Sequence, residues 1–318
     1  MKPRKLRKIL VPIDYSKESM KTLRVAKLLA ERWRAQLDLV HVVPPSPPAF
    51  ATHHVMFPIA PSTETQRAEL RRLEDFAFEQ SVQPLRYSCI VRRGAAAEKI
   101  NETARKTGAD LIAIATRGFT GLKYAFLGST TAEVVRTARC PVLVVRELEY
   151  VSSKERARRG RTPLQFKKLL VPLDFSDCSR VGLDYALDVA RDFRSSVLLF
   201  HSIIVQTYTL GHAYTSLQAA DLIKLQQEHA QESLGKLRRE LSSKFKVETA
   251  IGLGSTVEQI NKCVRSHRVD LIITSTHGRT GLKRLFIGST AEQIVRHAIC
   301  PVLVVPNRPA QQKLRKRG

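Results

Sequence analysis

The sequence contains no run of about 18 apolar residues, so it predicts no membrane-spanning helix. After the basic first residues, Pro12 and Asp14 interrupt a short apolar run that is too brief for the core of a signal peptide. Cysteine is scarce as well: five residues are scattered along the chain and form no Cys-x-x-Cys pair. This usage excludes a disulfide framework or a cysteine zinc site and indicates reduced thiols in a cytoplasmic protein.

Sequence motifs of several common enzyme and nucleic-acid-binding classes are missing too. The sequence has no Walker A loop, no zincin motif and no Gly-x-Ser-x-Gly elbow. Aromatic residues make up only 6%, and no RNP, KH or helix-turn-helix signature accompanies them. Adjacent His53 and His54 lie in a Pro-rich stretch, which is typical of a solvated loop, with a metal site as the alternative. The sequence therefore assigns no metal ligand.

Acidic residues are few beside the basic ones. The chain carries 53 Lys and Arg against 29 Asp and Glu, a net charge of +24. Three short segments, 1–8, 150–168 and 308–318, hold sixteen of these net charges, so the remainder of the chain is only mildly basic. An excess of this size suits an anionic partner, either nucleic acid or an anionic lipid surface, and says nothing about the fold.

The chain repeats itself. Its 318 residues are enough for about two domains of ordinary size. Lys8–Asp14 reappears as Lys168–Asp174, and 19 of 30 positions are identical between 116–145 and 276–305, all at an offset of 160. A constant offset over so long a unit indicates two whole domains in tandem, because solenoid repeats are only about 20–50 residues long.

A polar, basic stretch separates the two copies. It contains Gly160 and Pro163, as expected of a linker. The sequence predicts a first domain over 1–148, a basic linker over 149–166, a second domain over 167–308 and a basic tail over 309–318.

Strands and helices alternate within each copy. In the first, strands are expected at 9–13, 37–43, 85–91, 111–115 and 141–145, with helices after Ser16 and over 63–80, 95–106 and 129–138. Strands that are apolar on both faces and separated by helices predict an α/β fold with a parallel sheet covered on both sides. Ligands of such sheets bind beyond the carboxyl ends of the strands.

The loop after the fourth strand is rich in glycine. In the first copy it contains Gly118 and Gly128 and leads into Ser129 and Thr130 at the start of a helix. Glycine permits a close approach of the backbone to a ligand, and the first N–H groups of a helix favour an anion. The loop is therefore a candidate phosphate cradle. An ordinary strand–turn–helix junction is the alternative, with about equal support from these residues alone.

Carboxylates follow the first strand of each copy. Asp14 and Asp174 come after a Val-Pro pair at the same sheet edge as the glycine loop. Such a carboxylate could accept ribose hydroxyls or hold a metal on phosphates, or it could cap the next helix. Asp110 and Asp270, which begin strands, are typical of turn residues. His41, repeated as His201, indicates a structural hydrogen bond.

Taken together, these motifs resemble the universal stress protein family. The resemblance rests on Val-Pro-Ile/Leu-Asp, on the Gly-x9-Gly-Ser loop and on Cys-Pro-Val-Leu-Val-Val, and it covers both copies. It implies two tandem Rossmann-like domains of the adenine nucleotide α-hydrolase type, each a five-stranded parallel sheet of order 3-2-1-4-5. It also implies that strands 142–145 and 302–305 pair the two domains, with a homodimer as a further expectation.

The resemblance also implies an ATP site in each domain. Pro12 and Asp14 would line the nucleoside end, Val42 would give adenine a backbone contact, and Gly118 would flank the ribose and phosphates. Backbone groups at Gly128, Ser129 and Thr130 would hold the phosphates. The matching positions of the second domain are Pro172, Asp174, Ser202, Gly278, Gly288, Ser289 and Thr290. Ala115 and Ser275 stand where the family motif has its first glycine.

The leading hypothesis is therefore an adenine-nucleotide-binding protein with a regulatory role in the stress response. Its ligand could be ATP, ADP or a cyclic nucleotide, with or without Mg²⁺. The sequence shows no general base that would lie opposite the glycine loop. We therefore expect that the protein is not an enzyme, or that it hydrolyses ATP at most slowly. One alternative is a nucleic-acid-associated basic protein, based on the net charge. Another is an interaction scaffold whose nucleotide sites have decayed, based on Ala115 and Ser275.

Overall fold

A computed structural model describes residues 6–45, 63–116, 127–146, 166–204, 216–276 and 288–307. The chain divides into two compact units, Met1–Val145 and Arg146–Gly318. Several predicted features lie outside the described residues: Gly118 and Gly278 of the candidate site, His53 and His54, and most of the three basic segments, the linker included.

The first unit is an α/β fold with one parallel sheet. Its elements are β1 (Lys8–Pro12), α1 (Lys17–Trp33), β2 (Gln36–Val43), α2 (Thr63–Glu79), β3 (Tyr87–Arg93), α3 (Ala96–Thr107), β4 (Leu111–Ala115), α4 (Ser129–Thr137) and β5 (Val142–Val145). The strands pair in the order β3-β2-β1-β4-β5, and every pair is parallel. The predicted order 3-2-1-4-5 is confirmed.

The second unit repeats this topology. Its elements are β6 (Lys168–Pro172), α6 (Asp177–Phe193), β7 (Ser196–Ile203), α7 (Ser216–Leu241), β8 (Val247–Leu253), α8 (Thr256–His267), β9 (Leu271–Ser275), α9 (Ser289–His297) and β10 (Val302–Val305). The strands pair in parallel in the order β8-β7-β6-β9-β10. The second copy differs most in α7, which has 26 residues where α2 has 17.

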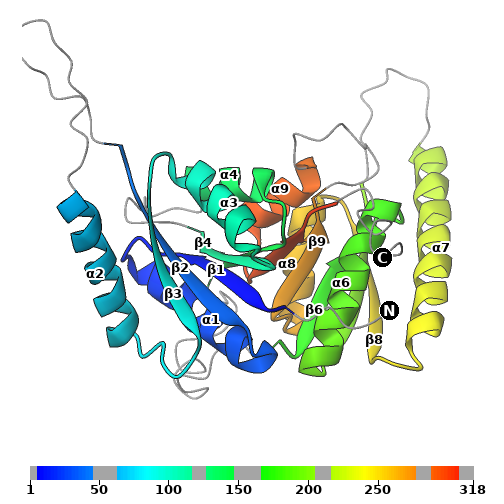
Figure 1. Cartoon of the computed structure of the whole chain (residues 1–318). Helices are drawn as coiled ribbons and strands as arrows, with labels where there is room; N and C mark the ends of the chain where they lie inside the picture. The colour runs from blue at the N-terminus through cyan, green and yellow to red at the C-terminus, as the bar shows by residue number, and fades with distance from the viewer. Residues whose placement is uncertain are drawn as a thin grey trace, which may run out of the picture. The chain divides into compact units, whose positions relative to one another are not determined.

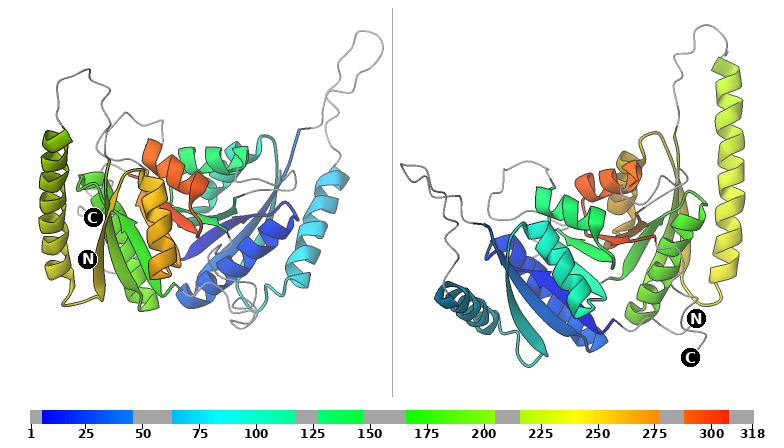
Figure 2. Two further views of the ribbon diagram at one scale, coloured as in Figure 1. Left: turned by 180° about the vertical axis from the view of Figure 1, so that it is seen from behind. Right: turned by 45° about the horizontal axis from the view of Figure 1, so that its top comes forward.

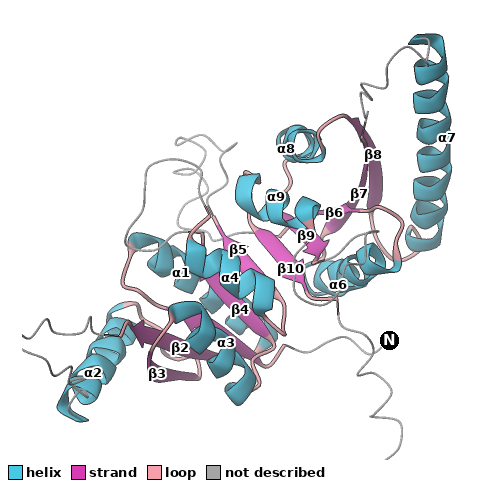
Figure 3. Cartoon of the chain, turned by 90° about the horizontal axis from the view of Figure 1, so that it is seen from above, coloured by secondary structure: helices cyan, strands magenta, loops and turns pink. Residues whose placement is uncertain are grey.

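Helices cover both faces of each sheet (Figure 1). Right-handed crossovers place α1 and α2 on one face of the first sheet and α3 and α4 on the other. In the second unit, α6 and α7 share one face, and α8 and α9 share the opposite one. The view from above shows α3 beside α4 and α8 beside α9 (Figure 3). The inner strands are therefore buried on both sides: every residue of β4 and of β9 is buried.

Local signals in the sequence set the helix starts. The hydroxyl of Ser16 accepts the N–H of Ser19 at the N-terminus of α1, as predicted for a capping serine. Ser176 does the same for α6. In contrast, β3 begins at Tyr87, two residues later than expected. Leu85 is not in the strand because its N–H donates to the carbonyl of Val82 and closes a turn.

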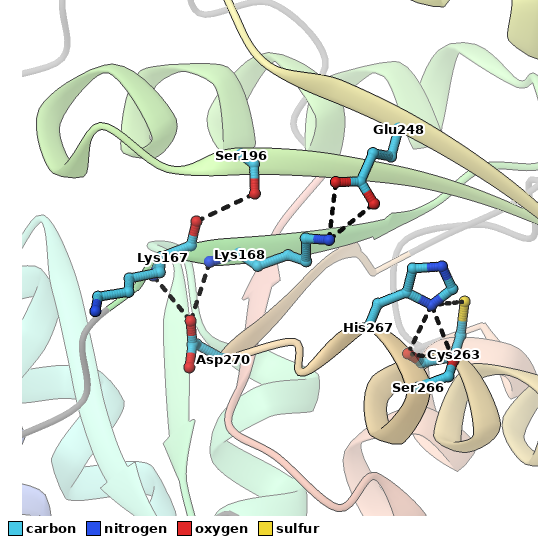
Figure 4. A network of polar contacts seen from close by, with 8 residues as sticks. All are labelled: Lys167, Lys168, Ser196, Glu248, Cys263, Ser266, His267 and Asp270. Carbon is cyan, nitrogen blue, oxygen red and sulfur yellow. Dashed lines mark hydrogen bonds and ion pairs between the residues drawn. The ribbon is translucent and has the colours of Figure 1, made fainter. Parts of the chain in front are cut away.

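Asp110 and Asp270 do more than make turns. One carboxylate oxygen of Asp270 accepts the backbone N–H groups of Lys167 and Lys168, at 2.9 and 3.0 Å (Figure 4). Asp110 accepts those of Arg7 and Lys8, at 2.8 and 3.1 Å. Each aspartate therefore ties the amino end of the fourth strand of its unit to that of the first. We call this arrangement the amino-edge clasp.

Further polar contacts surround the clasp of the second unit (Figure 4). The Lys168 ammonium donates to both carboxylate oxygens of Glu248, at 2.9 and 2.8 Å, which lowers the pKa of that carboxyl. Cys263 lies beside His267 on α8, and its burial raises the pKa of the thiol to about 11.

All five cysteines are free. Cys300 is fully buried, whereas Cys140, at the matching position of the first unit, is half-buried. Within the described ranges, no helix combines the length and the apolar character needed to cross a lipid bilayer.

Candidate functional site

Three residues of the first unit lie at one height along the carboxyl edge of the sheet. The register pairs Pro12 with Val40 and Leu10 with Ile112. Continuing that register beyond the end of β1 places Asp14 level with Val42 on one side and with Thr116 on the other. The end of β1 is thus flanked by the ends of β2 and β4, the arrangement at which open parallel sheets bind ligands.

The Asp14 carboxylate orders the turn into α1. Its Oδ1 accepts the backbone N–H of Ser16 at 3.1 Å and the Ser16 hydroxyl at 2.6 Å. Ser16 is in turn the cap of the helix, so Asp14 acts on the cap and is not the cap itself. Asp174 makes the same two contacts with Ser176, at 3.0 and 2.6 Å. Both aspartates are half-buried, so their carboxylates are held at the sheet edge within reach of solvent.

The glycine loop returns to the end of β4. The Gly128 N–H donates to the carbonyl of Thr116 at 2.8 Å, and the Thr131 hydroxyl donates to the carbonyl of Ala115 at 2.7 Å. These two bonds hold the start of α4 against the strand end that neighbours Asp14. In the second unit, the Gly288 N–H donates to the carbonyl of Thr276 at 2.7 Å.

The first turn of α4 offers N–H donors. Among the described residues no side chain caps the helix, and no acidic residue lies in its first turn. The N–H groups of Ser129 and Thr130 therefore have no acceptor within the helix, and the helix dipole adds positive potential there. The N–H of Gly128 donates to the carbonyl of Thr116 in this structure, so the donors of this turn that point to a ligand are those of Ser129 and Thr130.

Gly128 has ordinary backbone angles. Its φ is −60° and its ψ is 143°, a conformation open to any residue, and Gly288 is similar at −57° and 140°. Backbone conformation therefore does not require glycine at either position. Ala115 and Ser275 likewise end strands in extended conformation, and neither has a positive φ. Their side chains cause no backbone strain at the first position of the glycine motif.

The second unit differs at the same edge. Ser202 takes the place of Val42, and its hydroxyl donates to the carbonyl of Gly254 at 3.4 Å. Ser289 and Thr290 line an open cavity of about 500 Å³ between α8 and α9, and Ser255 and Thr256 add further hydroxyls. Pro172, Asp174 and Ser202 do not line this cavity.

Aromatic residues that directly follow the aspartates also lie at this edge, and the sequence alone assigned them no role. Tyr15 has a φ of 62°, and its ring lies 4.8 Å from that of His41, whose Nδ1 lies 2.7 Å from the carbonyl oxygen of Ile13. Burial raises the pKa of Tyr15 to about 12. Phe175 repeats the conformation, with a φ of 63° and its ring 4.6 Å from His201. The signal in the sequence was an aromatic residue directly after each aspartate.

Comparison with known proteins identifies the family. The model of the universal stress protein family matches the chain twice, over residues 5–146 and 165–306. The chain belongs to this family. The two matches confirm a tandem universal stress protein with one family domain in each half.

Single-domain relatives each match about half of the chain. Universal stress protein MJ0531 of Methanocaldococcus jannaschii is 30% identical over 165 residues, which is 52% of this chain and 95% of the relative. Universal stress protein YxiE of Bacillus subtilis is 32% identical over 147 residues, which is 44% of this chain and 98% of the relative.

Solved structures match the tandem chain over most of its length. A universal stress protein from Archaeoglobus fulgidus has a TM-score of 0.61 at 18% identity and covers 94% of this chain and 98% of its own. The protein PA1789 from Pseudomonas aeruginosa has a TM-score of 0.65 at 19% identity and covers 95% and 92%. At these identities the likeness shows the universal stress protein fold and nothing about the ligand.

Proposed function

We propose that each unit of this universal stress protein binds an adenine nucleotide, foremost ATP, at the carboxyl edge of its sheet, and that binding serves regulation in the stress response. The observation that carries the proposal is the common height of Asp14, Val42 and Thr116, with Gly128 tied to Thr116. The Asp14 carboxylate thus lies one strand away from the end of β2 on one side, and one strand away from the end of β4, where α4 begins, on the other. The second unit repeats the arrangement with Asp174, Ser202 and Gly288.

The residues fit a nucleotide by chemistry. In the proposed complex, backbone groups at Val42 contact the adenine, and the Asp14 carboxylate accepts ribose hydroxyls beside Pro12. The N–H groups and hydroxyls of Ser129 and Thr130 bind the phosphates. Pro172, Asp174, Ser202, Ser289 and Thr290 take these roles in the second unit. Gly128 and Gly288 serve by close approach, since their N–H groups are already used and their φ values do not require glycine.

The proposal is tested on protein as purified. We expect denaturation to release adenine nucleotide, identified by chromatography, at up to two molecules per chain. Calorimetric titration of stripped protein should then give saturable binding of ATP, with ADP and cyclic AMP as competitors and GTP as the control. Binding of GTP as tight as ATP would contradict an adenine site. A stripped protein that binds none of these nucleotides would leave the scaffold hypothesis standing.

The nucleic-acid alternative requires its own experiment, because its basic segments lie largely outside the described residues. Leu6 is buried, so a truncation that spares the fold must stop at residue 5. Removal of 1–5 and 309–318 is expected to leave the melting temperature within about 2 °C, because exposed charges contribute little to stability. The same truncation should weaken binding to heparin and flatten its salt dependence, since phosphate contacts release counterions. If the truncated chain bound heparin with the same affinity and the same salt dependence, the basic residues that bind heparin would lie outside the two deleted segments.

A further inference from the structure

A second cavity lies in the second unit between α6 and α7. Its volume is about 210 Å³. Figure 2 shows the two helices in green and yellow on the same side of the sheet. The walls of the cavity come from the turn after β6, from α6 and from the C-terminal half of α7. None of the lining residues belongs to the proposed nucleotide site, although Phe175 directly follows Asp174.

In the first unit, the aromatic ring of the corresponding turn is covered. The Tyr15 ring has the ring of Phe76 edge-on at 5.4 Å, at an interplanar angle of 84°. The guanidinium carbon of Arg72 lies 4.2 Å from the centre of the Tyr15 ring. Both partners come from α2. One helix therefore supplies an aromatic ring and a cation to the aromatic residue that follows the aspartate.

In the second unit, α7 cannot supply such a ring. It contains no Phe, Tyr or Trp in its 26 residues. The Phe175 ring packs on His201 and lines the cavity. The opening also exposes the neighbouring cap: Ser16 is buried, whereas Ser176 is half-buried. At the offset of 160, Lys236 stands at the position of Phe76, so no aromatic ring from α7 covers Phe175.

The walls of the cavity define the chemistry of an occupant. Phe175 and three leucines form its apolar part, and Leu183 is buried at 3% exposure. Arg180 and Lys236 bring two positive charges. Arg180 lies 4.0 Å from the Glu240 carboxylate and also interacts with Asp184, so Lys236 carries the positive charge that is less compensated. An apolar cavity of about 150 Å³ is enough to bind benzene. The volume therefore suits one aromatic ring with a small substituent, and the charges favour an anion.

We propose that this cavity is a binding site for a small aromatic carboxylate. The ring packs against Phe175 as Phe76 packs against Tyr15, and the carboxylate faces Arg180 and Lys236. The inference does not rest on the nucleotide proposal, because none of the residues assigned to contact the nucleotide lines this cavity. It gives the second unit a ligand that the first unit, already filled by Phe76, does not take.

The test uses phenylacetate with the full-length protein. Ligand-observed NMR and calorimetry should show one molecule bound per chain. Phenylacetamide, which lacks the charge, and hexanoate, which lacks the ring, should both bind more weakly. Ser233→Phe places a ring inside the cavity and should abolish binding, whereas Gln231→Phe, at an exposed position of α7, should leave it unchanged. Lys236→Gln should weaken binding about fivefold, the scale of one exposed charge pair, with Arg238→Gln as its control.

Each outcome decides the proposal. Circular dichroism and the melting temperature establish whether the variants are folded. If the Ser233→Phe variant does not fold, Leu237→Phe offers a second way to fill the cavity. Failure of phenylacetate to bind at millimolar concentration would overturn the proposal. So would binding that survives a folded cavity-filling variant, or hexanoate binding as tightly as phenylacetate. ATP titrations of the same variants should be unaffected, which separates this site from the nucleotide site.

Discussion

Gly128→Val is expected to abolish ATP binding in the first unit and to leave the fold intact. The φ of −60° and ψ of 143° at Gly128 are open to valine, so the substitution introduces no left-handed strain. Its side chain would instead occupy the space at the start of α4 where the proposed phosphates approach the N–H groups of Ser129 and Thr130. Steric exclusion removes all the contacts of the phosphates at once, so we expect the affinity to fall below detection.

Graded variants show whether bulk or hydrogen bonding matters. Ser129→Ala removes one hydroxyl and should weaken binding by about 1 kcal/mol, the value of one neutral hydrogen bond. Gly288→Val should abolish binding in the second unit alone, and the double glycine variant should bind no ATP. Gly235→Ala on α7 is the matched glycine control, since its added Cβ would meet only the tip of Arg239 at 3.6 Å.

Calorimetry counts the sites that remain. The stoichiometry should drop by one for each glycine variant, with unchanged circular dichroism. A folded double variant with wild-type ATP affinity would mean that the phosphates do not bind at the start of α4 and α9. The assignment of Ser129, Thr130, Ser289 and Thr290 would fail with it.

Asp270→Ala is expected to destabilise the second unit by about 3 kcal/mol. The substitution removes both hydrogen bonds of the clasp, so the N–H groups of Lys167 and Lys168 lose their acceptor. These groups lie beside Asp270, which is only 7% exposed, so water has little access to replace the carboxylate. Hydrogen bonds to charged groups contribute about 1.5–3 kcal/mol each, and burying an unpaired donor is costly. The result is measured as the free energy of unfolding in urea, with the two units followed as separate transitions.

Two control variants separate the effect of losing the hydrogen bonds of the clasp from the effect of losing a negative charge. Asp270→Asn keeps an acceptor oxygen at the same place and should cost about half as much. Asp221→Ala removes an exposed carboxylate from α7 and should leave stability within about 0.5 kcal/mol. Equal midpoints for Asp270→Ala and the wild-type protein would mean that the N–H groups of Lys167 and Lys168 find other partners and that the clasp does not stabilise the unit.

Much of the fold could be predicted because its signals are local. Apolar runs such as 111–115 predict buried strands, and Ser16 predicts the start of α1 through its own hydroxyl. The start of β3 was missed because it depends on a turn closed between Leu85 and Val82. The clasp was missed because Asp110 and Lys8 are 102 residues apart in sequence, and no local pattern links a carboxylate to a distant backbone N–H.

The candidate site could be predicted only in part. The repeat pointed to Asp14 and Gly128, and parallel register explains why strand ends come together. The use of the Gly128 N–H by Thr116 depends on how the loop closes, which composition does not reveal. The cavity beside Phe175 adjoins α7, which has no aromatic residue. That absence has meaning only once the two units can be compared.

The amino-edge clasp has a consequence for how duplicated domains diverge. Because it sits at the opposite end of the strands from the ligand edge, substitutions at one end need not loosen the other. The two copies of this chain show this difference between the two ends. Both clasps have an aspartate. At the ligand edge, in contrast, Val42 corresponds to Ser202, Ala115 to Ser275 and Tyr15 to Phe175. Selection could thus retune one copy for a new ligand while the other kept the ancestral task.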